Sequence, residues 1–167
     1  MTKFSSQLIK MAERVITTEA LVVGSRASGE ASLVLTLFTR ELGLVQVYAR
    51  GVRLHKAKLR YHVQDYAFAR VTLVPGVEYW RLIGAIPSEA GTRVATAYLA
   101  QAAGLINRFM GLHQVHADIF DLLSECDGDS QSFSLRMLDS LGYVGVEASS
   151  PAHATVLIER AYRESHL

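Results

Sequence analysis

The stretch "ASLVLTLFTRELGLVQVYARG", residues 31–51, contains two apolar runs separated by the turn "RELG". Side chains alternate between the two faces of a strand, so each run divides into two sets. One set is aliphatic: Leu35, Leu37, Val45, Val47 and Ala49. The other set is polar or aromatic: Thr36, Phe38, Arg40, Gln46, Tyr48 and Arg50. This pattern predicts two neighbouring strands with one buried face.

Three further strand patterns flank this pair. "EALVVGS" at 19–25 ends at Gly24 and Ser25, "YAFARVTLV" at 66–74 alternates with period two, and "VEYWRLIGA" at 77–85 follows the turn Pro75-Gly76. Five short strands in about 70 residues predict a small closed or nearly closed barrel. The longest connector falls between the third and fourth strands, where the OB-fold places its extra segment.

After Pro87 the composition becomes helical. The residues at 92–111, 113–126, 130–142 and 149–167 have helical apolar spacing or helix-start and helix-end signals. We therefore predict an α+β protein in which an N-terminal five-stranded OB-fold barrel (17–86) precedes a small all-α helical domain (87–167). Residues 1–16 are an N-terminal extension, either a short helix or a loose leader.

Composition describes a globular chain with an uneven charge. Half of the 167 residues are apolar, there is one cysteine, and the net charge is +1. Residues 1–85 carry twelve basic and six acidic residues, whereas 86–167 carry five basic and ten acidic residues. No apolar run approaches the ~18 residues of a membrane span, and no secretory signal is evident. We expect a cytoplasmic location and no membrane association.

The basic half has its densest charge in "ARGVRLHKAKLR", residues 49–60, which contains five basic residues and no acid: Arg50, Arg53, Lys56, Lys58 and Arg60. Lys and Arg that neutralise phosphates release counterions and drive sequence-independent binding. Five contacts with a single strand would give a log–log salt slope of about −3.5. The alternative is a solvated loop, and we favour binding because the connector adjoins the predicted barrel.

Aromatic residues beside arginines extend this candidate site. Tyr48 could stack a base or cover the barrel, and Phe38 is expected to be buried at the barrel end or against the helical half. Tyr66, Phe68 and Arg70 repeat the pattern in the fourth strand. The predicted nucleic-acid contacts are Arg26, Arg40, Tyr48, Arg50, Arg53, Lys56, Lys58, Arg60 and Arg70.

Catalytic and metal-site signatures are weak. His113 and His116 lie at helical spacing close to Asp118, but no third ligand has convincing spacing, so incidental histidines at a helix start are the preferred interpretation. The sequence has no P-loop, nucleophile elbow or zinc-protease motif. We expect no catalytic residue, no metal and no cofactor.

The order of several short elements resembles the bacterial RecO family of recombination mediators. The elements are Thr18-Glu19, Gly29-Glu30, Leu35-Thr36 with Thr39, Gly43, the run 49–53, Gln64, Gly76, Leu135-Arg136 and Leu141-Gly142-Tyr143. The likeness covers about residues 17 to 143. The chain is shorter than typical members, is shortened after Tyr143, and lacks the cysteine zinc module that many of them carry.

The resemblance implies an OB barrel followed by a helical domain, and it implies binding and annealing of single-stranded DNA. It also implies recombinase loading with RecR, and docking of the single-strand-binding protein's acidic tail on the helical domain. We therefore expect a nucleoid-associated, non-enzymatic DNA-repair mediator. One alternative is a protein-interaction adaptor whose barrel does not bind DNA. The other is an RNA-binding OB module, which would recognise the 2′-OH that only RNA offers. A small hydrolase ranks last.

Overall fold

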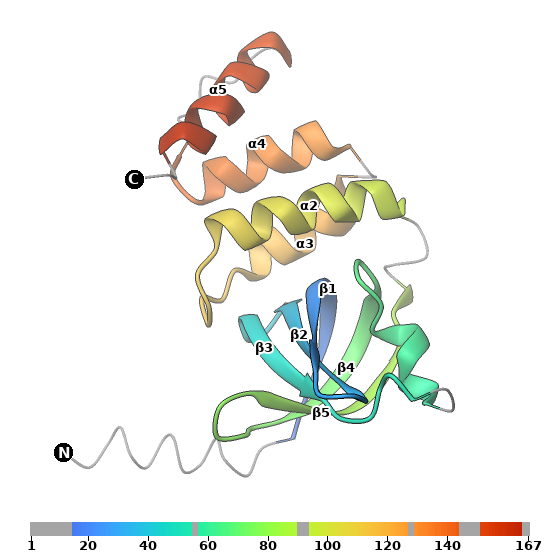
Figure 1. The fold of residues 1–167 in the computed structure, drawn as a ribbon. Coiled ribbons are helices and arrows are strands. Elements are labelled where there is room, and N and C mark those ends of the chain that lie inside the picture. The colour runs from blue at the N-terminus through green and yellow to red at the C-terminus, as the bar shows by residue number, and fades with distance from the viewer. Residues whose placement is uncertain (1–14, 55–56, 90–93, 127–128, 144–150, 165–167) are drawn as a thin grey trace, which may run out of the picture.

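The computed structural model describes residues 15–54, 57–89, 94–126, 129–143 and 151–164. It contains a barrel with four helices stacked above one side of it (Figure 1). The strands are β1 (Ile16–Ser28), β2 (Ser32–Thr39), β3 (Gly43–Ala49), β4 (Phe68–Val74) and β5 (Trp80–Pro87). The helices are the 3₁₀ helix η1 (Lys58–His62), α2 (Thr96–Phe109), α3 (Ala117–Glu125), α4 (Ser130–Ser140) and α5 (Pro151–Glu164). The prediction for 1–16 falls almost wholly outside the described residues.

The five strands form a closed barrel in the order β1-β2-β3-β5-β4. All neighbours are antiparallel except β3 and β5, which pair in parallel at Val47 with Trp80 and Tyr48 with Arg81. The barrel closes where β1 pairs with β4. Helix η1 lies in the connector between β3 and β4. This is the OB-fold, and the prediction of a five-stranded OB barrel followed by helices is confirmed.

Strand β1 is longer than the sequence pattern predicts. We expect Gly24 and Ser25 to end the strand, but it continues to Ser28. The register between β1 and β2 shifts between Val22 and Gly24, which marks a bulge. Bulges bend and twist a strand, and here the bend lets one strand pair with β4 through its first half and with β2 through its second.

The barrel interior is aliphatic, as the alternation predicts. Its fully buried members include Val22, Leu35, Leu37, Val45 and Val47. Trp80 packs against the same interior and is only partly buried. Apolar side chains from all five strands meet there, so the hydrophobic effect closes the sheet on itself.

A second core joins the outer wall of the barrel to the helices. Leu21, Phe38 and Leu44 point away from the interior and pack against α2 and α3. The ring of Phe120 on α3 lies 5.4 Å from the ring of Phe38 and 5.3 Å from that of Phe68, measured between centroids. The expectation that Phe38 is buried against the helical half is confirmed.

The loop between α2 and α3 also attaches to the barrel. Leu112 forms an isolated parallel bridge with Leu44, and the His113 N–H donates to the Leu44 carbonyl at 2.8 Å. Gly43 has φ of +70°, and a Cβ at this position would lie 1.9 Å from the Gln114 carbonyl oxygen. Only glycine allows this backbone conformation and this close approach together.

The helices of the described residues are all too short or too polar to cross a bilayer.

Candidate nucleic-acid interface

A row of side chains crosses four strands on the outer surface of the barrel. In the strand register Arg26 on β1 lies opposite Val34 on β2, Val34 lies opposite Tyr48 on β3, and Tyr48 lies opposite Arg81 on β5. Register partners share a face of the sheet, so the four residues form one line. We call Arg26, Val34, Tyr48 and Arg81 the outer row. It places an aromatic ring between two exposed arginines.

The β4–β5 loop folds back onto this row. The guanidinium of Arg26 donates to the Tyr79 hydroxyl at 3.0 Å, and its central carbon lies 5.7 Å from the centroid of the Tyr79 ring. Val34, the member of the row between Arg26 and Tyr48, is almost fully buried. In OB-folds the face of strands two and three and the β1–β2 and β4–β5 loops are the usual oligonucleotide surface. Arg81 and Tyr79 are not among the residues predicted from the sequence.

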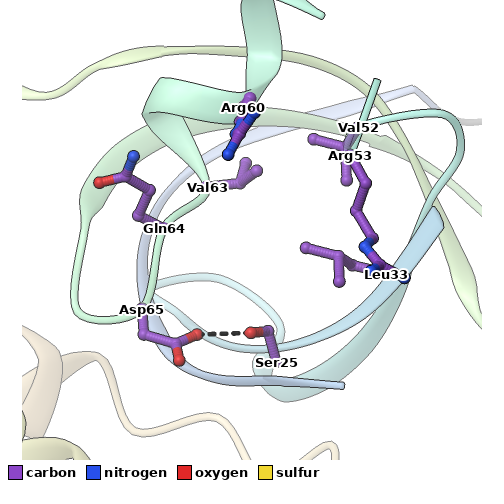
Figure 2. Close-up of a pocket in the computed structure, with 8 residues that line it drawn as sticks. All are labelled: Ser25, Leu33, Val52, Arg53, Arg60, Val63, Gln64 and Asp65. Atoms are coloured by element: carbon purple, nitrogen blue, oxygen red, sulfur yellow. Dashed lines mark hydrogen bonds between the residues drawn. The ribbon is translucent and has the colours of Figure 1, made fainter. Parts of the chain in front are cut away.

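The basic connector, residues 49–60, follows β3 and runs into η1, which precedes β4. Arg50, Arg53, Lys58 and Arg60 are all exposed, and Lys56 lies outside the described residues. Arg50 comes directly after β3, two residues beyond Tyr48. Arg53 and Arg60 line one pocket at the end of the barrel (Figure 2). The structure therefore brings part of the predicted set to the outer row and part to this pocket.

The pocket, which we call the mouth pocket, has a volume of about 420 Å³. It is lined by Ser25, Leu33, Val52, Arg53, Arg60, Val63, Gln64 and Asp65. The Ser25 hydroxyl donates to the Asp65 carboxylate at 2.6 Å on the side opposite Arg60 (Figure 2). Arg60 and the Asp65 carboxylate thus lie at opposite sides of the mouth pocket, and the Arg53 side chain runs along a third side toward Leu33 (Figure 2).

Two predicted arginines have carboxylate partners in the same chain. Arg40 donates to both oxygens of Asp121 on α3, at 2.8 and 3.0 Å, and this hydrogen bonding holds the pKa of the Asp121 carboxyl below its ordinary value. Arg70 pairs with Glu19 at 2.7 Å. Arg40 links the barrel to α3 and Arg70 links β4 to β1, so the charges of both arginines are balanced within the chain.

The histidine pair does not share a helix, contrary to the sequence interpretation. Helix α3 begins at Ala117, so His116 is its N-cap residue and His113 lies in the preceding loop. Asp118 accepts a hydrogen bond from Ser140 on α4. Within the ranges that the structure covers, no group of three or more potential metal ligands occurs.

Comparison with known proteins agrees with this architecture. The family model described as "Recombination protein O N terminal" matches residues 11–82. A "DNA repair protein RecO" of Heliobacterium modesticaldum (strain ATCC 51547 / Ice1) is 35% identical, with 78% of this chain and 52% of that protein aligned. A protein with the same description from Desulfitobacterium hafniense (strain DSM 10664 / DCB-2) is 29% identical, with 77% of this chain and 52% of that protein aligned. Another, from Roseiflexus sp. (strain RS-1), is 27% identical, with 93% of this chain and 60% of that protein aligned.

The chain therefore spans little more than half the length of these curated relatives. The matched region includes nearly the whole barrel, and its strand order is that of an OB-fold. The sequence likeness and the architecture together show that the chain belongs to the RecO family.

Proposed function

We propose that the chain binds single-stranded DNA across the outer row. The observation that carries this proposal is the register that aligns Tyr48 between Arg26 and Arg81. A base can stack on the exposed part of the Tyr48 ring, while the two guanidiniums meet the phosphates on either side. Stacking on an aromatic residue contributes about 1–3 kcal/mol per base and does not depend on which base is present.

The outer row favours a single strand over a duplex for a physical reason. Stacking needs an unpaired base whose face is free, which a duplex does not offer. Arg50, two residues beyond Tyr48, and Lys58 on η1 add exposed positive charge to the barrel domain. Their attraction to phosphate supplies affinity without sequence preference and makes binding depend strongly on salt.

We extend the proposal to a role as a recombination mediator in DNA repair. The chain would act on DNA in the cytoplasm, and it would do so without catalytic residues. Positive charge on the barrel reduces the repulsion between two strands, which favours annealing of complementary DNA. The relatives, each named "DNA repair protein RecO", support this assignment. The proposed partners are RecR and the single-strand-binding protein, and the proposed outcome is recombinase loading.

Fluorescence anisotropy of labelled oligothymidine, measured over a series of salt concentrations, tests the outer row. We expect Tyr48→Ala to weaken binding about 5- to 150-fold with little change in salt slope, because it removes stacking and no charge. Arg81→Ala should weaken binding and reduce the slope by about 0.7, because one phosphate contact is lost. Arg163→Ala, an exposed arginine near the end of α5, is the matched control.

Unchanged affinity and slope in both Tyr48→Ala and Arg81→Ala would overturn the proposed site. The wider role is tested by annealing of complementary oligonucleotides and by pull-down with RecR and single-strand-binding protein. The adaptor alternative predicts partner capture without any binding of oligonucleotides. The RNA alternative predicts that matched RNA outcompetes DNA.

A further inference from the structure

The mouth pocket has a chemical character that phosphate binding alone does not explain, because it combines two arginines with a carboxylate (Figure 2). We propose that it receives one nucleotide of the bound strand and selects bases that carry an amino group. Arg60 would hold the phosphate, Arg53 would add positive charge at the edge of the pocket, and Asp65 would accept a hydrogen bond from the base. This inference rests on the proposed function and adds base selection to it.

The two arginines of the pocket come from separate segments and lie at different sides of it (Figure 2). Arg60 belongs to η1, and its side chain points into the opening (Figure 2). The backbone N–H of Arg53 donates to Ala31 at 2.9 Å, and its side chain donates to the Gly29 carbonyl at 3.2 Å. Neither arginine forms an ion pair with another of the described residues. Guanidinium groups match phosphate oxygens in geometry as well as in charge.

The middle of the mouth pocket is apolar. Val52 and Val63 are each only 2% exposed, and Leu33 packs on the barrel interior beside them. Aliphatic side chains of this kind offer a surface against which a planar base can lie. A volume of about 420 Å³ falls in the range of about 300–1,000 Å³ that small-molecule sites occupy.

The opposite side accepts hydrogen bonds. One oxygen of Asp65 receives the Ser25 hydroxyl at 2.6 Å. An ionised carboxylate can only accept hydrogen bonds, and it repels a second phosphate. The ligand must therefore be anionic at one end and a hydrogen-bond donor at the other. Nucleotides of cytosine, adenine and guanine meet this requirement through their exocyclic amino groups. Uracil and thymine have a carbonyl oxygen in place of the cytosine amine, and their one donor, the ring N3–H, lies between two carbonyl oxygens that a carboxylate repels.

The mouth pocket and the outer row are adjacent. Ser25 and Leu33 line the pocket, and the next residues along β1 and β2, Arg26 and Val34, belong to the row. Neighbouring residues of a strand point to opposite faces, so row and pocket lie on the two sides of the barrel wall. A strand that lies on the row reaches the pocket by crossing the rim of the barrel.

The test compares oligodeoxycytidine with oligodeoxyuridine, each about twelve nucleotides long, at neutral pH. The two bases differ at position 4, where cytosine has an amino group and uracil a carbonyl oxygen, and at ring N3, which accepts in cytosine and donates in uracil. We expect the full chain to prefer the cytidine strand by about fivefold or more. Asp65→Asn should reduce this preference below about twofold, because an amide both donates and accepts hydrogen bonds. Asp139→Asn, which alters an exposed carboxylate on α4, should keep it.

Equal affinity of the unaltered chain for both strands, or a preference that survives Asp65→Asn, would overturn base selection in the mouth pocket. These outcomes leave the outer row intact, since stacking on Tyr48 does not need an amino group. Normal binding by the Tyr48 and Arg81 variants together with a preference that Asp65→Asn abolishes would instead overturn the row and keep the pocket. A chain that binds neither strand would overturn both proposals.

Discussion

Gly43 lies where the start of β3 contacts the α2–α3 loop of the helical half. Its φ is +70°, and the Gln114 carbonyl oxygen occupies the place of a side chain. Gly29, in the β1–β2 turn, has a similar φ of +65°, but a Cβ there meets no described atom within 4 Å. An alanine at Gly29 would therefore lose stability only through its left-handed backbone conformation. An alanine at Gly43 would lose stability through the same conformation and through a clash with Gln114 as well.

We predict that Gly43→Ala destabilises the chain far more than Gly29→Ala. The Gly29 variant should lose about 1–2 kcal/mol, the cost of the left-handed conformation for a residue with a Cβ. The Gly43 variant should lose about 1–3 kcal/mol more, because the Gln114 peptide must move. Urea denaturation of the three chains measures both losses. Equal losses would mean that the loop at Gln114 contributes nothing to stability.

Sequence reasoning finds residues that depend on local pattern and misses those that depend on distant pairing. Alternation places Tyr48 on the outside of β3 because side chains of a strand switch faces at each residue. It does not reveal Arg81 as the neighbour of Tyr48, because the parallel pairing of β3 with β5 brings together residues 33 positions apart. Nor does it show that Asp121, on a helix, engages Arg40.

Helix α3 is the element that holds the helical half on the barrel. Its Phe120 is 5% exposed and lies between the rings of Phe38 and Phe68. The Arg40–Asp121 pair adds a link at the surface, but both side chains are more than 40% exposed. Exposed pairs of this kind contribute less than about 1 kcal/mol, so the aromatic cluster dominates the attachment.

Phe120→Ala is accordingly expected to cost about 3–5 kcal/mol in the free energy of unfolding, through lost burial and the cavity left behind. Val156→Ala on α5 removes an apolar side chain that is 57% exposed, and it should change stability by less than about 0.5 kcal/mol. Denaturant titrations compare both variants with the unaltered chain. A Phe120 variant as stable as the Val156 variant would show that α3 is not the main attachment.

The elements themselves were predictable to different degrees. The strands follow from period-two alternation and from turn residues such as Pro75-Gly76. The extent of β1 does not, because a glycine that normally ends a strand can also occupy a bulge inside it, as Gly24 adjoins one here. Helix α3 starts four residues later than its predicted range, because the residues from His113 instead pair with β3.

At the scale of the whole molecule, the barrel and the helices share a core rather than meeting at a polar interface. Leu21, Phe38 and Leu44 of the barrel are buried in the same cluster as Ile106 and Phe133 of the helices. Strand β5 ends at Pro87, next to the boundary predicted between 86 and 87, and apolar packing continues across this point. Neither half can unfold without exposing apolar surface of the other.

We predict that both halves unfold in one transition. Trp80, the only tryptophan, lies on β5 and reports on the barrel by fluorescence, while far-ultraviolet circular dichroism reports mainly on the helices. The two signals should give the same midpoint and the same slope in urea, as expected for a two-state domain. Separate midpoints would show that the two halves are thermodynamically independent.

The attachment of the α2–α3 loop to β3 has one more consequence, which concerns many copies of the chain acting together. Strand β5 pairs with β3 only at Val47 and Tyr48. Nearer the start of β3, Leu112 of the α2–α3 loop forms a bridge with Leu44. An unpaired strand edge invites another molecule to add its own strand. Because its own loop occupies this edge, copies of the chain that crowd together should not join their β3 strands into a shared sheet.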